Sequence, residues 1–161
     1  MDKLSFSAKN LLSQLERNGK RVCCAESCTG GMIAATLTDI PGSSSIFSRG
    51  FVTYSNQAKM DMLGVKSQTL ELHGAVSAQT VSEMASGALT ASNGEADFAI
   101  AVSGVAGPDG GSEKKPVGLV YICILKKGEI GKINKYIFDG DRQSVRVQTT
   151  QQALENLILI V

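Results

Sequence analysis

Hydrophobic residues recur at helical spacing in three long parts of the chain. Near the start, one face collects Leu4, Ala8, Leu11, Leu12 and Leu15. Residues three and four positions apart lie on the same side of an α-helix, so this spacing predicts a helix with one buried face. Ser5 or Ser7 is expected to cap this helix and Gly19 to end it. The same spacing predicts a helix that starts at Ser77 and a final helix that opens at Asp141.

Stretches rich in apolar, aromatic and β-branched residues predict five strands. They cover residues 21–25, 46–54, 98–102, 118–125 and 132–138. The last two flank a turn at residues 127–129 and therefore predict an antiparallel hairpin. Short helices are expected after the first strand, up to Asp39, and after the second strand, from Ser55 and Asn56 to Gly64.

Helices alternate with strands early in the chain, and a hairpin comes late. This order predicts an α/β fold, a single-domain layered sandwich over residues 1–161 with a mixed, partly parallel sheet flanked by helices. We find no internal repeat, low-complexity tract or linker that would divide the chain. Most glycines fall at expected strand-to-helix turns, on the side of the sheet where open α/β sheets bind ligands.

The charge balance argues against large anionic partners. Lysine and arginine together number 16 and aspartate and glutamate 15, which gives a formal net charge of +1. Proteins that bind nucleic acid or an anionic membrane surface generally carry a basic excess, so neither partner is expected. The apolar runs are far shorter than the ~20 residues of a membrane span. No signal peptide is visible at the start, so a cytoplasmic protein is expected.

The chain contains four cysteines and one histidine. Cys23, Cys24, Cys28 and Cys123 follow neither a C-x-x-C pattern nor zinc-site spacing, so reduced thiols are expected. A Ser-His-Asp triad or a centre of several histidines would depend on His73 alone. The sequence therefore predicts no metal and no cofactor, and a hydrolase of this sequence would use another base.

The segment A-E-S-C-T-G-G around Ser27 lies where a predicted strand passes into a predicted helix. A hydroxyl at Ser27 would stand beside the free N–H groups of the helix, which can hold an oxyanion or a phosphate. Cys28 is an alternative nucleophile, although cysteine hydrolases usually pair the thiol with histidine. The simpler interpretation is that Ser27 or Thr29 caps the helix and that Gly30 and Gly31 permit close packing. Spacing alone favours the cap.

A second candidate is the segment V-T-Y-S-N-Q-A-K, which contains Tyr54 and Lys59. If Asn56 caps the helix, Lys59 lies in its first turn, where the helix dipole disfavours positive charge and lowers the pKa of a lysine. Such a lysine can act as a base, and the Tyr54 phenol could relay a proton. The alternative is a solvated surface lysine and a core tyrosine, which these residues alone favour.

A third candidate is the glycine-rich segment that follows the strand at residues 98–102 and begins with Ser103 and Gly104. It could close over a phosphate or a ribose, or it could be a long hairpin-like connection. It lacks the G-x-G-x-x-G and G-x-x-x-x-G-K-[ST] patterns, so neither a dinucleotide fold nor a P-loop follows. Arg142, at the start of the final helix, could meet an anion, although such an arginine is more often solvated.

Several segments together resemble the C-terminal domain of the competence/damage-inducible protein A (CinA) family. The resemblance rests on A-E-S-C-T-G-G, P-G-S-S, V-T-Y-S-N-x-A-K-x-x-x-L-G-V, S-G-V-A-G-P-D-G-G-S-x-x-K-P-V-G and G-D-R, which occur in this order between Arg21 and Arg146. In that family a serine, a tyrosine and a lysine form the catalytic group. The motifs place them at Ser27, Tyr54 and Lys59.

The resemblance implies an amidohydrolase without metal that converts nicotinamide mononucleotide to nicotinate mononucleotide and ammonia. Ser27 would be the nucleophile, with assistance from Lys59 and Tyr54 in proton transfer, and a homodimer is expected. The implied substrate contacts are the oxyanion donors Thr29, Gly30 and Gly31 and the phosphoribosyl contacts Gly42, Ser103, Gly104 and Arg142. The alternative is a non-catalytic module, linked to competence or DNA damage, that binds a nucleotide or a partner protein.

Overall fold

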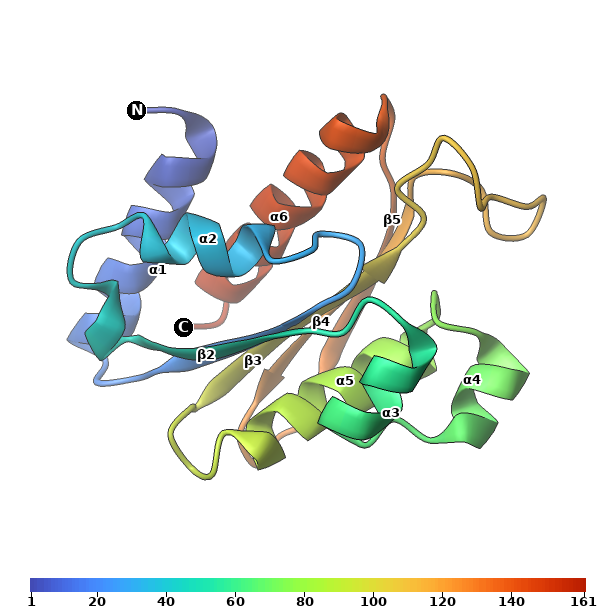
Figure 1. The fold of residues 1–161 in the computed structure, drawn as a ribbon. Coiled ribbons are helices and arrows are strands. Elements are labelled where there is room, and N and C mark those ends of the chain that lie inside the picture. Colours follow the sequence, from blue (N-terminus) through green and yellow to red (C-terminus); the bar gives the residue numbers. More distant parts are fainter.

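A computed structural model describes residues 1–161 and shows a five-stranded sheet covered by helices on both faces (Figure 1). In chain order the elements are α1 (Lys3–Arg17), β1 (Val22–Glu26), α2 (Met32–Thr38), the short 3-10 helix η1 (Ser43–Ser45), β2 (Phe47–Val52), α3 (Asn56–Leu63), α4 (Ser67–His73), α5 (Ala78–Ala91), β3 (Phe98–Gly104), β4 (Leu119–Lys126), β5 (Lys132–Ile137) and α6 (Arg142–Ile158).

The sheet has the strand order β2-β1-β3-β4-β5. Strand β1 pairs in parallel with both β2 and β3, whereas β4 pairs antiparallel with β3 and with β5. Parallel neighbours need a crossover connection, which α2 provides between β1 and β2, while the short turn between β4 and β5 allows a hairpin. The predicted α/β class with a mixed, partly parallel sheet is confirmed.

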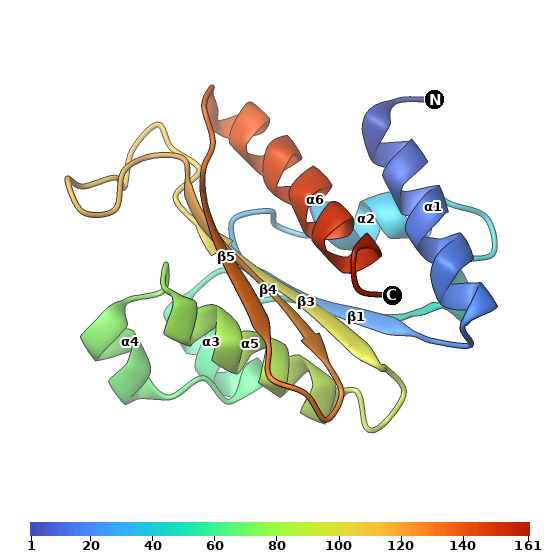
Figure 2. The same ribbon diagram turned by 180° about the vertical axis from the view of Figure 1, so that it is seen from behind.

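Each face of the sheet has its own helix layer and its own core. Helices α1, α2 and α6 cover one face, and α3, α4 and α5 cover the other (Figures 1 and 2). Side chains alternate along β1, so that Val22 and Cys24 join the first core while Cys23 and Ala25 join the second. All five residues of β1 are buried for this reason, and the first four, residues 22–25, form a continuous apolar run.

Helix boundaries follow the predictions closely, but the start of α1 and the presence of α4 differ from them. Asp2, and neither Ser5 nor Ser7, caps α1, because its carboxylate accepts the Ser5 N–H at 2.9 Å. Helix α4 was not predicted, because its start depends on a tertiary contact. The Glu83 carboxylate, on α5, accepts the Lys66 N–H at 3.0 Å and the Thr69 hydroxyl at 2.7 Å, which fixes the first turn of α4.

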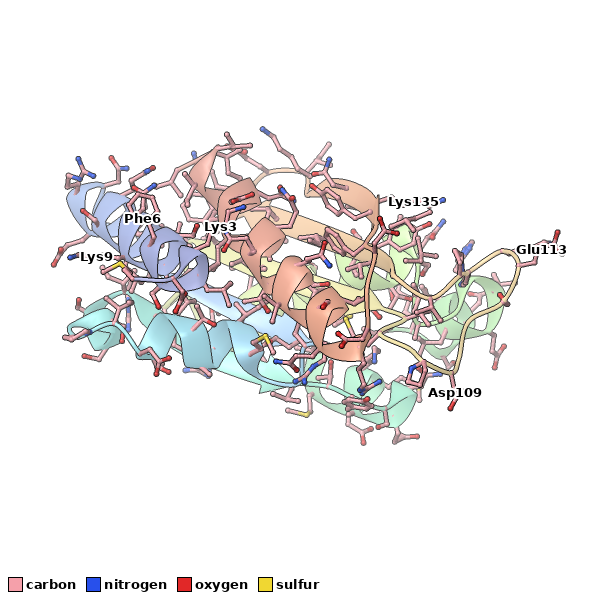
Figure 3. All side chains as sticks on the ribbon, turned by 90° about the horizontal axis from the view of Figure 1, so that it is seen from above. Lys3, Phe6, Lys9, Asp109, Glu113 and Lys135 are labelled. Atoms are coloured by element: carbon pink, nitrogen blue, oxygen red, sulfur yellow. The ribbon has the colours of Figure 1, made fainter.

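The three parallel strands end at the same edge of the sheet. Glu26, the last residue of β1, lies opposite Val52 of β2 and Val102 of β3. The segments after these strands, the loop 105–118 and the start of α6 therefore converge there (Figure 1). Seen from above, Asp109 and Glu113 lie on this loop, at the opposite end of the molecule from Lys9 on α1 (Figure 3). None of the helices combines the length and the apolar character that crossing a bilayer requires.

Candidate active site

A pocket of about 290 Å³ lies at the edge where the parallel strands end. It is built by the turn after β1, the segment from β2 into α3, the stretch before α5, the end of β3 with its loop, and the first residue of α6. Its lining residues are Ser27, Cys28, Tyr54, Lys59, Ala75, Val76, Ser103, Gly104, Val105, Ala106, Gly107, Asp109, Gly110 and Arg142. Six of the predicted site residues line this pocket: Ser27, Tyr54, Lys59, Ser103, Gly104 and Arg142. Arg142 comes from the start of the last helix, far from the others in the sequence.

Ser27 and Lys59 are in direct contact. The Lys59 ammonium nitrogen Nζ lies 2.9 Å from Ser27 Oγ, although the two residues are 32 positions apart. Nζ also donates to the main-chain oxygen of Thr53 at 2.8 Å and lies 3.4 Å from that of Tyr54. Three oxygens thus surround the amine, and only the serine oxygen can also donate a proton.

Lys59 is among the most deeply buried side chains of the protein, with 1% of its surface exposed. Ser55 caps α3 by accepting the Ala58 N–H at 3.0 Å, so the cap is Ser55 rather than Asn56. Lys59 then follows in the first turn and points back toward β1. Burial lowers the pKa of Lys59 from 10.5 to about 8, because the charged form is poorly solvated there. The interpretation of Lys59 as a solvated surface residue is wrong.

The turn after β1 leaves the Ser27 hydroxyl free for this contact. Gly31 is the N-cap of α2 and offers no side-chain bond. The carboxylate of Glu26 caps the helix in its place, accepting the N–H groups of Ile33 at 2.9 Å and Ala34 at 3.0 Å. The interpretation of Ser27 or Thr29 as the helix cap is therefore wrong, and the local sequence pattern did not predict this role of Glu26.

Cys28 lies in the pocket next to Ser27 but is poorly suited to attack. Burial raises the pKa of its thiol to about 11, and therefore the reactive thiolate is scarce near neutral pH. All four cysteines are free and buried, and no three His, Cys, Asp or Glu side chains lie together where they could hold a metal. The alternative with Cys28 as nucleophile has no support in this arrangement.

Tyr54 and Arg142 meet at the mouth of the pocket. Arg142 donates to the Tyr54 hydroxyl at 2.8 Å and to the main-chain oxygen of Gly107 at 2.8 Å. The Tyr54 side chain is 60% exposed, and its hydroxyl makes no hydrogen bond with Ser27 or Lys59. The prediction of a core tyrosine is wrong, and the predicted proton relay through the phenol is not assembled in this structure.

Ser103 and Gly104 form the end of β3 and the floor of the pocket. Ser103 is buried, and a Cβ on Gly104 would lie 2.6 Å from a methyl carbon of Val120 and 2.8 Å from the oxygen of Leu119. Only glycine fits at this position, because β3 and β4 approach closely there. Ser103, Gly104 and Arg142 thus line the same pocket as Ser27 and Lys59, and their contact with a phosphoribosyl group stays a prediction.

Other predicted contacts do not line this pocket. Gly42 lies between α2 and β2, where β2 begins, at the opposite edge of the sheet. Thr29 is fully buried and donates its hydroxyl to Glu26 at 2.6 Å. The Gly30 N–H already donates to the main-chain oxygen of Ser27 at 3.1 Å, so it is not free for a ligand. Gly31 does not line the pocket either.

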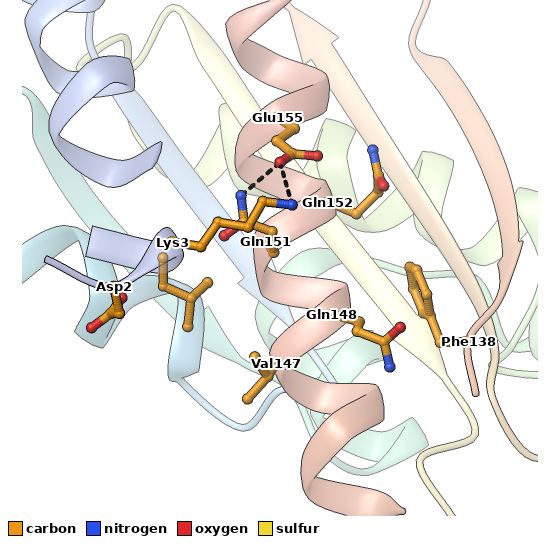
Figure 4. Close-up of a pocket in the computed structure, with 9 residues that line it drawn as sticks. Asp2, Lys3, Phe138, Val147, Gln148, Gln151, Gln152 and Glu155 are labelled. Carbon is orange, nitrogen blue, oxygen red and sulfur yellow. Dashed lines mark hydrogen bonds and ion pairs between the residues drawn. The ribbon is translucent and has the colours of Figure 1, made fainter. Parts of the chain in front are cut away.

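A larger pocket of about 580 Å³ lies elsewhere, between the start of α1 and the middle of α6 (Figure 4). Glutamines and an ion pair between Lys3 and Glu155 at 3.2 Å dominate its wall. Its lining residues are Asp2, Lys3, Leu4, Phe138, Val147, Gln148, Gln151, Gln152 and Glu155. It contains no serine, cysteine or buried lysine, in contrast to the pocket that Ser27, Cys28 and Lys59 line.

Comparison with known proteins identifies close relatives. Residues 5–161 match the CinA C-terminal domain. The chain is 53% identical over 143 residues to the nicotinamide-nucleotide amidohydrolase PncC of Escherichia coli K12, covering 89% of this chain and 86% of that protein. It is 52% identical over 158 residues to a CinA-like protein of Endomicrobium trichonymphae, covering 97% of this chain and 35% of that protein.

The fold is also similar to solved structures. The crystal structure of the competence/damage inducible protein CihA from Agrobacterium tumefaciens matches with a TM-score of 0.94 and 45% identity, covering 99% of this chain and 96% of that one. The match to the family includes every segment that builds the pocket. Sequence and fold agree over nearly the whole length, and the chain belongs to the family of CinA C-terminal domains.

Proposed function

We propose that this protein hydrolyses the carboxamide of nicotinamide mononucleotide, giving nicotinate mononucleotide and ammonia. The observation that carries the proposal is the 2.9 Å contact between Ser27 Oγ and the buried Nζ of Lys59. A serine beside a lysine with a pKa lowered to about 8 is a nucleophile with its own base. The similarity to a nicotinamide-nucleotide amidohydrolase supplies the substrate.

The surroundings of Lys59 orient its amine for this role. A neutral amine has two N–H donors and one lone pair. The main-chain oxygens of Thr53 and Tyr54 can only accept, so they take the two N–H groups. The lone pair is then directed at Ser27 Oγ and can receive the hydroxyl proton. Lys59 is thus the immediate base, and Tyr54 assists through its main-chain oxygen.

Acylation begins when Ser27 Oγ attacks the carboxamide carbon and the hydroxyl proton of Ser27 passes to Lys59 Nζ. The carbon–nitrogen bond then breaks, and Lys59 returns the proton to the departing nitrogen, which leaves as ammonia. The resulting ester joins Ser27 to the nicotinoyl group. Water attacks this ester while Lys59 takes one proton from the water molecule, and that proton returns to Ser27 Oγ as the carboxylic acid leaves. The acid then gives its own proton to the released ammonia, so the products are a carboxylate and an ammonium ion.

The tetrahedral intermediate requires a donor for its negative oxygen. Cys28 directly follows the nucleophile in the chain and lines the pocket, and its main-chain N–H donates to no main-chain oxygen. We assign it this role in place of the Gly30 N–H, which is occupied. At the mouth, Arg142 uses only two of its five N–H donors, so it retains donors for the substrate phosphate.

The test is release of ammonia from nicotinamide mononucleotide by the purified protein, with plain nicotinamide as the comparison substrate. Ser27→Ala is expected to abolish release while the protein stays folded, since only one hydroxyl is lost. Cys28→Ser is the matched control and is expected to keep most of the activity. Residual activity of about a tenth or more in Ser27→Ala would contradict the nucleophile, because losing a nucleophile costs far more.

The same assay separates this function from that of a module that binds a nucleotide or a partner without turnover. Such a module would bind nicotinamide mononucleotide, as measured by calorimetry, and release no ammonia. We further propose that the protein works in the cytoplasm as a homodimer. Size-exclusion chromatography with light scattering measures the mass of the particle in solution. A mass near the 16.9 kDa of one chain would contradict the dimer.

A further inference from the structure

Two side chains outside the pocket hold the turn that carries Ser27. The first is Glu26, whose carboxylate has no exposed surface. Besides the two N–H groups at the start of α2, it accepts the Thr29 hydroxyl at 2.6 Å and lies 3.6 Å from the Cys24 sulfur. A buried carboxylate is tolerated because donors surround it, and these donors fix the turn to both β1 and α2.

The second side chain is Arg146, which approaches the same turn from α6. Its Nε donates to the main-chain oxygen of Cys28 at 3.1 Å, and its terminal nitrogen donates to that of Thr29 at 2.9 Å. The fork of the guanidinium therefore spans two successive carbonyl groups. Arg146 lies one helical turn after Arg142, so the same face of α6 reaches both the turn and the pocket mouth.

Thr29 is held from both sides. Its side chain is bonded to Glu26 within the core, and its main-chain oxygen is bonded to Arg146 on the outer side. The main-chain oxygen of Ser27 closes the turn by accepting the Gly30 N–H at 3.1 Å. No bond of the Ser27 side chain itself, apart from the contact with Lys59, sets the position of its hydroxyl. The direction of Oγ therefore depends on the main chain of this turn.

We propose that Glu26 and Arg146 are positioning residues, which hold the 27–30 turn from its two sides and keep Ser27 Oγ in line with Lys59 Nζ. This inference rests on the proposed function of Ser27 as nucleophile. Neither residue lines the pocket, so neither is expected to contact the substrate. Loosening the turn displaces the nucleophile, and a displacement of about 1 Å can cost roughly a hundredfold in rate.

The test compares Glu26→Gln and Arg146→Met with the wild-type protein. Glutamine keeps the shape of Glu26 but directs an NH2 group at main-chain N–H donors. Methionine removes both bonds of Arg146 to the turn, together with its bond to the Gln143 side chain on α6. Each variant is expected to lower kcat about ten- to a hundredfold and to change KM less than about threefold. Arg146→Lys is expected to lose less, since an ammonium can serve one of the two carbonyls.

Two matched controls exist on the other face of the sheet. Glu83→Gln disturbs a carboxylate that also accepts a helix N–H and a threonine hydroxyl. Arg49→Met removes an arginine that bonds the main-chain oxygen of Ala91 at 2.9 Å and the Glu95 carboxylate at 2.8 Å. Both controls are expected to keep kcat within about threefold of wild type, whatever they do to thermal stability.

A second readout needs no substrate. Diisopropyl fluorophosphate phosphorylates an activated serine with loss of fluoride, and mass spectrometry follows the rate of this labelling, with Ser27→Ala as the blank. Labelling of Glu26→Gln and Arg146→Met is expected to slow by the same factor as kcat. If Glu26→Gln does not fold, Arg146→Met carries the test, because its side chain lies partly at the surface.

The outcomes separate the two proposals. If the wild-type protein neither releases ammonia nor is labelled, the proposed function fails. If it does both and folded Arg146→Met keeps kcat and labelling within threefold, only the positioning role is overturned. A rise in KM with unchanged kcat would likewise overturn it, because Arg146 would then act as a substrate contact.

Discussion

At the scale of single residues, the proposed chemistry depends first on Lys59. Only its neutral form can accept the Ser27 proton, and burial lowers the pKa of this amine to about 8. We expect kcat/KM to rise about tenfold per pH unit below that value and to level off above it. Lys59→Met is expected to remove this rise and to cost several orders of magnitude.

Lys59→Arg is the informative companion to that measurement. A guanidinium stays charged throughout this pH range, so the arginine variant is expected to be nearly as inactive as the methionine variant. Near-normal kcat in Lys59→Arg would mean that the lysine supplies only positive charge. The base would then have to be Tyr54 or a water molecule.

The free N–H donors of Arg142 at the pocket mouth lead to a second prediction. Arg142→Ala is expected to raise KM for nicotinamide mononucleotide roughly ten- to a hundredfold, since an arginine–phosphate bond contributes about 1.5–3 kcal/mol. The loss on nicotinamide riboside, which has no phosphate, is expected to be much smaller. Equal losses on the two substrates would show that Arg142 acts on something other than phosphate.

Tyr54→Phe distinguishes the two roles of that residue. The variant keeps the main-chain oxygen that faces Lys59 and loses only the hydroxyl that accepts from Arg142. We expect a modest rise in KM with kcat changed less than about threefold. A fall of kcat by orders of magnitude would show that the phenol moves into the proton path when substrate binds.

At the scale of elements, the pocket depends on how closely β3 approaches β4. Gly104→Ala would place a Cβ 2.6 Å from the Val120 side chain, so the strands must separate at the pocket floor. We expect a loss of about 1–3 kcal/mol in the free energy of unfolding and a fall in kcat/KM of at least about tenfold. Urea unfolding and the ammonia assay measure the two effects.

Gly128→Ala is the matched control for that substitution. Gly128 has a positive φ of 82° in the turn between β4 and β5, with open space around it. Alanine there is strained and is expected to destabilise the protein by about 1 kcal/mol while leaving kcat/KM unchanged. If both variants lose activity in proportion to stability, the pocket floor has no specific role.

At the scale of the whole molecule, the buried Lys59 makes folding depend on pH. The pKa of Lys59 falls from 10.5 in the unfolded chain to about 8 in the folded one. Between these values the unfolded chain binds more protons, so this residue adds stability as the pH rises through the window and loses it as the pH falls toward 8.

Lys59→Met lacks this dependence, which makes the comparison measurable. The free energy of unfolding of wild type relative to Lys59→Met is expected to rise by about 2 kcal/mol between about pH 7 and about pH 9.5. Other titrating groups are common to both proteins and cancel in the difference. A difference that stays constant across this range would mean that Lys59 titrates normally in the folded protein.

The sequence by itself determined the five strands and every helix except α4 and the short η1, together with their order. Apolar spacing is a local property, and so are caps such as Ser77 and Asp141, which both capped the expected helices. The alternation of helices and strands was sufficient for the α/β class. The motif resemblance brought Ser27, Tyr54 and Lys59 forward together, whereas each residue taken alone favoured an ordinary structural role.

Only the tertiary structure decided how those residues meet. Pairing of β1 with β2 brings Lys59 to Ser27, and the depth of the resulting pocket lowers the lysine pKa. The role of Glu26 as a remote helix cap and the reach of Arg146 from α6 depend on contacts across the chain. Local propensities act over a few positions and can therefore be recognised in short sequence patterns. Distances, burial and pKa values arise from packing between residues far apart in the chain, and no short pattern predicts them.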